Sequence, residues 1–190
     1  MNKYRIATWN VEKKKKNSKK TKLAVNKINE VNADILVLTE SSNSINLYHL
    51  YESVKSTPFE KTPDEHWVEI WSKWEITERI ETFNCNRTAC ALVNAPFGKI
   101  VIYGTIIPYH MAGVSGNRYG NLGYKAWQYH EEDIEKQSND WKRIKSNYEH
   151  DYFFVIGDFN QVRDNLPYGY GTKECRNLLT KKLEENDLTC

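Results

Sequence analysis

The sequence predicts an α/β protein in which helices cover the sheets. Short apolar runs suited to buried strands alternate along the chain with longer segments of helical periodicity. Polar residues follow three of the predicted strands, where α/β proteins gather their chemistry. With 39% hydrophobic and 27% charged residues in 190, the composition suits a globular protein and excludes a collagen-like, mucin-like or wholly disordered chain.

The first half of the chain begins with a strand over residues 4–10, followed by a Lys-rich loop. Residues 18–32 then place apolar side chains near helical spacing and predict a helix. Residues 35–38 (ILVL) form a continuous apolar run, typical of a strand buried on both faces. Residues 66–72 and 76–82 alternate in polarity and predict a hairpin.

In the second half, strands are predicted at residues 88–94 and 99–107 with a turn at 95–98, and another strand at 151–157. A long loop is predicted at 113–123 and a closing helix at 172–186. The clearest helix is residues 124–148, where Trp127 begins an apolar repeat of seven residues. His130 and Gln137 fall on its core side. They are either buried polar groups satisfied by backbone or supports behind an active site.

Other features limit the class of protein. No apolar run reaches membrane-spanning length, and the first ten residues show no secretory signal. The four cysteines lie far apart, which favours free thiols and a cytoplasmic location. Without repeats or linkers, we expect one domain over residues 1–190, and no feature indicates a protein partner.

Charge is uneven along the chain. Residues 1–30 have a balance of +8, whereas the formal net charge of the whole chain is only +2. Most of this excess lies in the run Lys13, Lys14, Lys15, Lys16, Lys19, Lys20 and Lys22. Such a run is either a solvated loop or localisation-like patch, or a polyanion-attracting surface beside a phosphate-handling site.

The three polar strand ends carry the functional signal. Asn10 ends the first strand, Glu40 follows ILVLT, and Asp158 and Asn160 follow FFVIG. Taken singly, these are a turn-forming Asn, a salt-bridged Glu and an Asx turn. Taken together, they indicate metal-assisted hydrolysis: Glu40 offers hard oxygen ligands for Mg²⁺ or Mn²⁺. Asp158, held by Asn160, is placed to orient or deprotonate water.

Four segments in order, TWNVE, ADILVLTE, VIYGTIIPYH and VIGDFN, resemble the endonuclease/exonuclease/phosphatase superfamily from residue 4 to about 188. This group includes apurinic endonucleases, pancreatic-type deoxyribonucleases, inositol polyphosphate 5-phosphatases and neutral sphingomyelinases. The resemblance implies a four-layered α/β sandwich, with two packed sheets flanked by helices. It also implies a Mg²⁺-dependent phosphodiester hydrolase.

The resemblance also implies roles for individual residues. Asn10, Glu12 and Glu40 match positions that hold or adjoin the metal, and Asn10 also lies beside the phosphate. Asp158 and Asn160 match the pair that positions the water and the scissile phosphate. The family places a Tyr or a His on the phosphate near residues 107–110. We expect His110 to handle a proton or bind phosphate there, with Tyr109 as a neighbour, unless His110 is an ordinary loop histidine.

One departure concerns the C-terminus. The family ends on strands that carry an Asp-His pair, and its His stabilises the pentacovalent phosphate. The histidines here are His49, His66, His110, His130 and His150, none of which follows an Asp. We expect a domain truncated before those strands, rather than a degenerate member. A sheet edge left open in this way predicts poor solubility or self-association.

Three functions compete. The first is a nuclease for DNA or RNA, favoured by the basic run and by Tyr119, Tyr124 and Trp127, which either stack on bases or simply pack. The second is a phosphatase or phosphodiesterase of a small or lipid phosphate. The third is a non-catalytic binding module. Segments 41–65 and 111–123 are the expected specificity loops.

Overall fold

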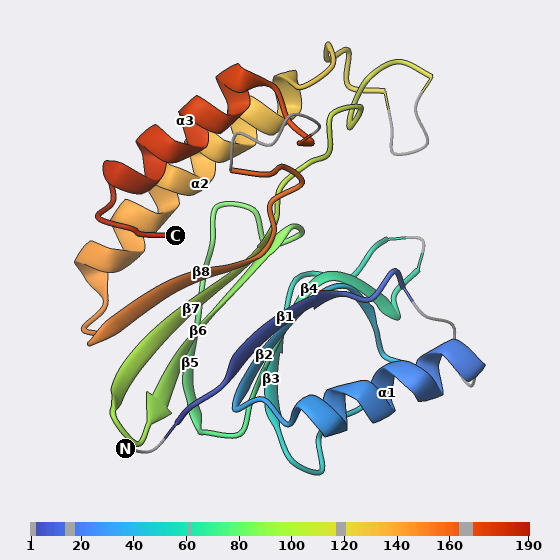
Figure 1. Ribbon diagram of the computed structural model, residues 1–190, viewed down its shortest axis with the longest axis vertical. Helices are drawn as coiled ribbons and strands as arrows, with labels where there is room; N and C mark the ends of the chain where they lie inside the picture. Colours follow the sequence, from blue (N-terminus) through green and yellow to red (C-terminus); the bar gives the residue numbers. More distant parts are fainter. Residues whose placement is uncertain (1–2, 14–17, 61, 117–120, 164–168) are drawn as a thin grey trace. The chain divides into compact units, whose positions relative to one another are not determined.

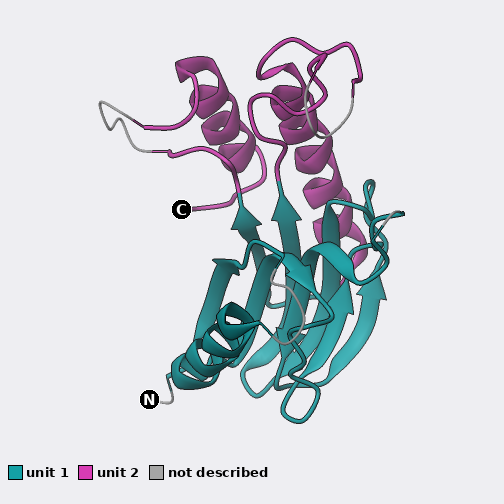
Figure 2. Ribbon diagram, turned by 90° about the vertical axis from the view of Figure 1, so that its right-hand side faces the viewer, with its two compact units in different colours: residues 1–106, 149–158 teal, residues 107–148, 159–190 magenta. Residues whose placement is uncertain are grey.

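The computed structural model describes residues 3–13, 18–60, 62–116, 121–163 and 169–190. It divides the chain into two compact units (Figure 2). Unit 1 comprises Met1–Ile106 and Glu149–Asp158, and unit 2 comprises Ile107–Tyr148 and Phe159–Cys190. The single domain remains a prediction.

Unit 1 contains two four-stranded sheets and one helix (Figure 1). Sheet 1 has the order β1-β2-β4-β3, and sheet 2 has the order β5-β6-β7-β8. Their elements are β1 (Ile6–Asn10), α1 (Lys19–Val31), β2 (Ile35–Ser42), β3 (Glu52–Lys55), β4 (Glu65–Ser72), β5 (Ile76–Ile80), β6 (Thr88–Ala95), β7 (Gly98–Ile106) and β8 (Tyr152–Asp158). Unit 2 contains α2 (Gln128–Asn147) and α3 (Lys173–Glu184).

The main core lies between the two sheets of unit 1. Aliphatic side chains from both sheets fill it, among them Val37, Ile70, Ala91 and Ile102. Gly104 on β7 permits the close approach, because a Cβ there would lie 2.7 Å from Cγ1 of Val68. The prediction of an α/β protein with two packed sheets is confirmed.

The other face of sheet 1 packs against α1. Ile28 of the helix joins Leu36, Leu38 and Trp71 of the sheet in a second buried cluster. Ser18 caps the helix, since its hydroxyl accepts from the Thr21 N–H at 3.1 Å. The predicted helix and the continuous buried strand β2 are therefore both present, and β2 runs further than predicted, to Ser42.

The predicted hairpin of residues 66–72 and 76–82 is wrong. Both strands exist, but β4 pairs with β2 and β3, whereas β5 pairs with β6 in the other sheet. The short link over residues 73–75 carries the chain between sheets. Alternation identifies a strand and its faces, but it does not choose the partner strand. Strand β3 was not predicted, whereas the hairpin of β6 and β7 is confirmed.

In unit 2, α2 and α3 pack together, and α2 buries His130 and Gln137 completely, as its periodicity predicts. Both helices are close to their predicted ranges. All four cysteines are free, as expected. In the part of the chain that the structure describes, no helix is long and apolar enough to cross a membrane.

β1 and β8 are edge strands of their sheets and lie next to each other. Within the described ranges, no further strand pairs with either of them. Trp9 on β1 is 39% exposed, and the apolar strand β8 is only half-buried. An open apolar edge is a template for pairing with another chain.

We expect the chain to self-associate through this edge. Trp9→Lys should raise the monomer fraction in sedimentation velocity, because a charged edge strand pairs poorly. Leu23→Lys is the control, since Leu23 is exposed on α1, away from the edge. An equal effect of both variants would place the association elsewhere.

Candidate active site

Three of the sequence-predicted site residues meet in unit 1. β1 and β2 run parallel, and Asn10 at the end of β1 pairs with Thr39, next to Glu40. Asp158 ends β8 in the other sheet. Packing of the two sheets therefore brings a β8 side chain to the ends of β1 and β2.

One amide group connects the three side chains. Nδ2 of Asn10 donates to Oε1 of Glu40 at 3.1 Å and to Oδ2 of Asp158 at 2.9 Å. Its Oδ1 accepts the N–H of Glu12 at 3.0 Å, which fixes the orientation of the amide. Asn10 thus turns its nitrogen toward the carboxylates, and its predicted role as a metal ligand remains a prediction.

The backbone around these residues is unusual. Glu12, Lys13 and Glu40 have φ values of 52°, 47° and 49°, which side chains rarely adopt. The two turns are joined, because the Lys13 N–H donates to the Glu40 carbonyl at 2.6 Å. Such strained residues cluster at functional sites, where the surrounding fold holds them in place.

Gly157 explains why Asp158 emerges where it does. Its φ is +154°, and a Cβ there would lie 1.8 Å from the carbonyl oxygen of Thr105. Gly157 pairs with Thr105 across parallel strands β7 and β8. Only glycine lets the backbones approach this closely at the last step before the carboxylate.

The donor set fits magnesium better than zinc. In the described ranges, no three His, Cys, Asp or Glu side chains form a metal-binding group, and no ion pair involves Glu40. Mg²⁺ is typically held by one or two carboxylates, with water and substrate phosphate completing its shell. Glu40 and Asp158 can supply those carboxylates, whereas zinc sites need three or four protein ligands. Glu12 is exposed, and its role as a ligand remains a prediction.

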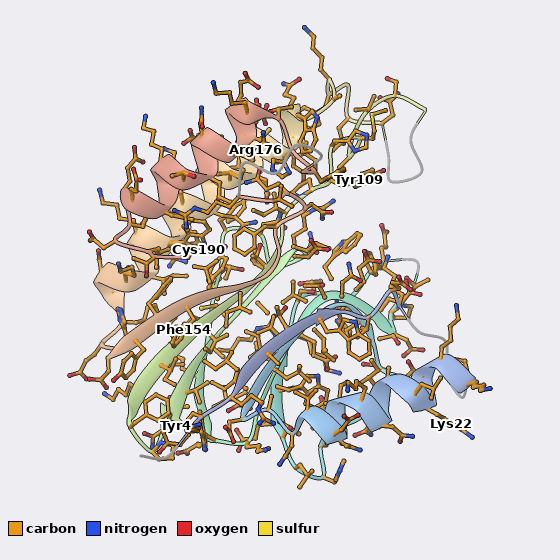
Figure 3. All side chains as sticks on the ribbon, viewed as in Figure 1. Tyr4, Lys22, Tyr109, Phe154, Arg176 and Cys190 are labelled. Atoms are coloured by element: carbon orange, nitrogen blue, oxygen red, sulfur yellow. The ribbon has the colours of Figure 1, made fainter. Side chains whose placement is uncertain are left out.

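The remaining predicted residues belong to unit 2. Nδ2 of Asn160, two residues beyond Asp158, donates to the Ile107 carbonyl at 2.9 Å. Nδ1 of His110 lies 2.5 Å from the hydroxyl of Tyr170. Tyr109, labelled in Figure 3, lies in the same loop as His110. Its ring is edge-on to the His110 imidazole. The sequence reasoning missed Tyr170, which no spacing connects to His110.

His130 joins the two loops that carry these residues. Its Nδ1 lies 2.6 Å from the Pro108 carbonyl, and its Nε2 lies 3.3 Å from the Gln161 amide. Burial lowers its pKa, so the ring is neutral and donates from Nδ1 to Pro108. Nε2 then accepts, which requires the Gln161 amide to present its NH₂ group. His130 is thus a buried polar group hydrogen-bonded by the backbone, and it also connects the loops that carry His110 and Asn160.

The other predicted aromatic and basic residues have varied surroundings. Tyr119 and Lys14–Lys16 lie outside the described residues. Tyr124 stacks on Tyr129, and its hydroxyl donates to Glu132, which raises the Tyr124 pKa. Trp127 packs against His110 and His130. Lys22 is exposed on α1 (Figure 3).

Comparison with solved structures identifies the architecture. An AP endonuclease from Archaeoglobus fulgidus matches with a TM-score of 0.65 and 16% identity, over 96% of this chain and 71% of that one. The endonuclease domain of TRAS1, a telomere-specific non-LTR retrotransposon, matches with a TM-score of 0.65 and 13% identity, over 96% and 72%. The chain has the endonuclease/exonuclease/phosphatase fold.

Two other matches have the same endonuclease/exonuclease/phosphatase fold. A TDP2 from C. elegans has a TM-score of 0.60 and 15% identity, over 83% of this chain and 48% of that one. A beta toxin from Staphylococcus aureus has a TM-score of 0.63 and 14% identity, over 99% and 73%. No family model matches the sequence, and comparison with curated proteins gives no significant match.

Asn10→Asp tests the central amide. The change replaces a donor by a third carboxylate, so we expect the free energy of unfolding in EDTA to fall by about 1–3 kcal/mol. Mg²⁺ should restore part of this loss, because a ligand of the folded state stabilises it. Urea unfolding measures both effects. Asn26→Asp, exposed on α1, is the control, and equal losses with and without Mg²⁺ would contradict the prediction.

His130 predicts a dependence of stability on pH. Because burial lowers its pKa, the unfolded chain takes up a proton more readily than the folded chain below the ordinary histidine value of about 6.5. The contribution of neutral His130 to the free energy of unfolding is present above that value and is lost as the pH falls toward the lowered pKa of the folded state. His130→Gln should lose less stability than the wild type between about pH 7.5 and pH 5.5 in urea unfolding. His49→Gln, at an exposed site, should behave like the wild type; no difference between the two variants would refute the assignment.

Proposed function

We propose that the chain is a Mg²⁺-dependent phosphodiester hydrolase that acts on nucleic acid. The observation that carries the proposal is the pair of carboxylates, Glu40 and Asp158, bonded to the single amide of Asn10 at the strand ends. Two acidic groups so close repel each other, and a divalent cation relieves that repulsion. The matched fold supports phosphoric ester hydrolysis as the general class of reaction.

The residues take distinct roles in this proposal. Glu40 holds the metal, with Glu12 and Asn10 beside it, and the metal supplies charge neutralisation at the phosphate. Asp158 orients the attacking water or accepts its proton. Asn160 positions the phosphate, as its amide is itself held by the Ile107 carbonyl. His110 and Tyr109 bind the phosphate or handle the leaving-group proton, with Tyr170 orienting His110.

Nucleic acid is the proposed substrate for two reasons. The basic run begins at Lys13, whose backbone N–H is bonded to the Glu40 carbonyl, so the run starts next to a proposed metal ligand along the chain. Two of the matched structures are described as endonucleases. Mn²⁺ offers the same hard-ligand chemistry as Mg²⁺ and belongs in the same assay.

Calorimetric titration and plasmid cleavage test the proposal together. Glu40→Gln should weaken Mg²⁺ binding by about tenfold or more, because it removes a charged ligand. Asp158→Asn should lower cleavage by about a hundredfold or more while retaining most of the metal affinity. Glu78→Gln, exposed on β5, is the matched control.

The outcomes separate the competing functions. EDTA-sensitive nicking of plasmid or abasic duplex supports the nuclease. Phosphate release from inositol phosphates, with nucleic acid untouched, would contradict the proposal that nucleic acid is the substrate. If Glu40→Gln binds Mg²⁺ and Asp158→Asn cleaves DNA as the wild type does, the roles proposed for Glu40 and Asp158 are wrong.

A further inference from the structure

A hollow lined in part by β4, the strand that pairs with β2 across from Glu40, is not used by the proposed hydrolysis. It measures about 430 Å³, within the range of small-ligand pockets. We call it the aromatic pocket; its lining residues, all in unit 1, are Thr57, Pro58, Phe59, Glu60, Trp67 and Asn86. Two walls are joined by the Thr57 N–H, which donates to the Cys85 carbonyl at 2.6 Å.

Two rings and two cations give the pocket its chemistry. The rings of Phe59 and Trp67 meet edge to face, with centroids 4.8 Å apart. Nζ of Lys13 lies 4.0 Å from the Phe59 centroid and 4.3 Å from that of Trp67. The Arg87 guanidinium lies 5.0 Å from the Trp67 centroid. Both cations lie over ring faces, and Nζ of Lys13 is also 3.8 Å from Oε2 of Glu65. A flat ring attached to an anion can take the place of Lys13 on a ring face, because its own anion then pairs with the displaced ammonium.

The pocket is tied to the carboxylate pair through the backbone. Lys13 contributes its side chain to the rings and its N–H to the Glu40 carbonyl, at 2.6 Å. Trp67 lies on β4 between Val68 and His66, which pair with the residues on either side of Glu40. The pocket is therefore connected to Glu40 through Lys13 and through the pairing of β4 with β2.

We propose that the aromatic pocket binds an unpaired nucleobase of the strand whose phosphate lies at the carboxylate pair. This inference rests on the proposed function and narrows it to single-stranded or locally unpaired nucleic acid. A base inside a duplex has its faces covered by its neighbours and its edge paired, so it must leave the stack to reach Phe59 and Trp67. Lys13, displaced from the rings by the base, and Arg87 then pair with the adjoining phosphates.

Binding measurements test the inference apart from catalysis. Fluorescence anisotropy with Ca²⁺ in place of Mg²⁺ compares a single-stranded DNA oligonucleotide, its duplex and an abasic oligonucleotide of equal length. The single strand should bind about tenfold more tightly than the abasic strand, because stacking on an aromatic side chain contributes at that scale. The duplex should bind more weakly than the single strand.

Variants assign the effect to the pocket. Phe59→Ala should reduce binding of the single strand to the abasic level and leave abasic binding unchanged. Trp67→Phe preserves a ring on the partly buried strand, so it should keep most of the affinity while losing base-induced quenching of tryptophan fluorescence. Tyr48→Ala is the matched control, since Tyr48 is 57% exposed and packs on Trp71 instead.

Failure of the pocket and failure of the proposed function look different. Equal binding of single-stranded and abasic DNA, or a Phe59→Ala variant that binds like the wild type, contradicts base binding in the aromatic pocket. If the same DNA is then cleaved in the presence of Mg²⁺, the proposed hydrolase activity is still supported. Duplex binding as tight as single-strand binding also overturns the pocket. Absence of both binding and cleavage for every nucleic acid overturns the proposed function and the pocket with it.

Discussion

The amide of Asn10 is the interaction on which the site depends. It joins residues 30 and 148 positions away along the chain and holds two carboxylates that would otherwise repel each other. The Glu12 N–H orients it, so the turn after β1 and the ends of β2 and β8 act together. Removing that amide leaves the same acidic residues without the group that aligns them.

The core of unit 1 makes this arrangement possible. Non-glycine residues at positive φ and the close approach of Gly157 to Thr105 cost free energy at the strand ends. Burial of the aliphatic side chains between the sheets offsets that cost, because each removes apolar surface from water. Part of the strain falls on residues of the proposed site, although Asn32, Trp127 and Asp187 elsewhere in the chain are also at positive φ.

Cations and a buried imidazole organise the surroundings within each unit. In unit 1, Lys13 reaches Phe59 and Trp67 while its backbone bonds Glu40, so the start of the basic run is anchored rather than free in solvent. In unit 2, neutral His130 connects the segments before His110 and after Asn160. These contacts anchor Lys13 in unit 1 and position the loops of unit 2.

The sequence by itself determined the α/β class, most strands and helices, and the polar strand ends at Asn10, Glu40 and Asp158, because periodicity and strand-end polarity are local properties. It did not determine that β4 and β5 join different sheets, because alternation carries no information about the partner strand. Nor did it reveal the Tyr170 contact with His110, or Lys13 over Phe59 and Trp67. Those contacts join residues with no fixed spacing along the chain, so only the tertiary structure decided them.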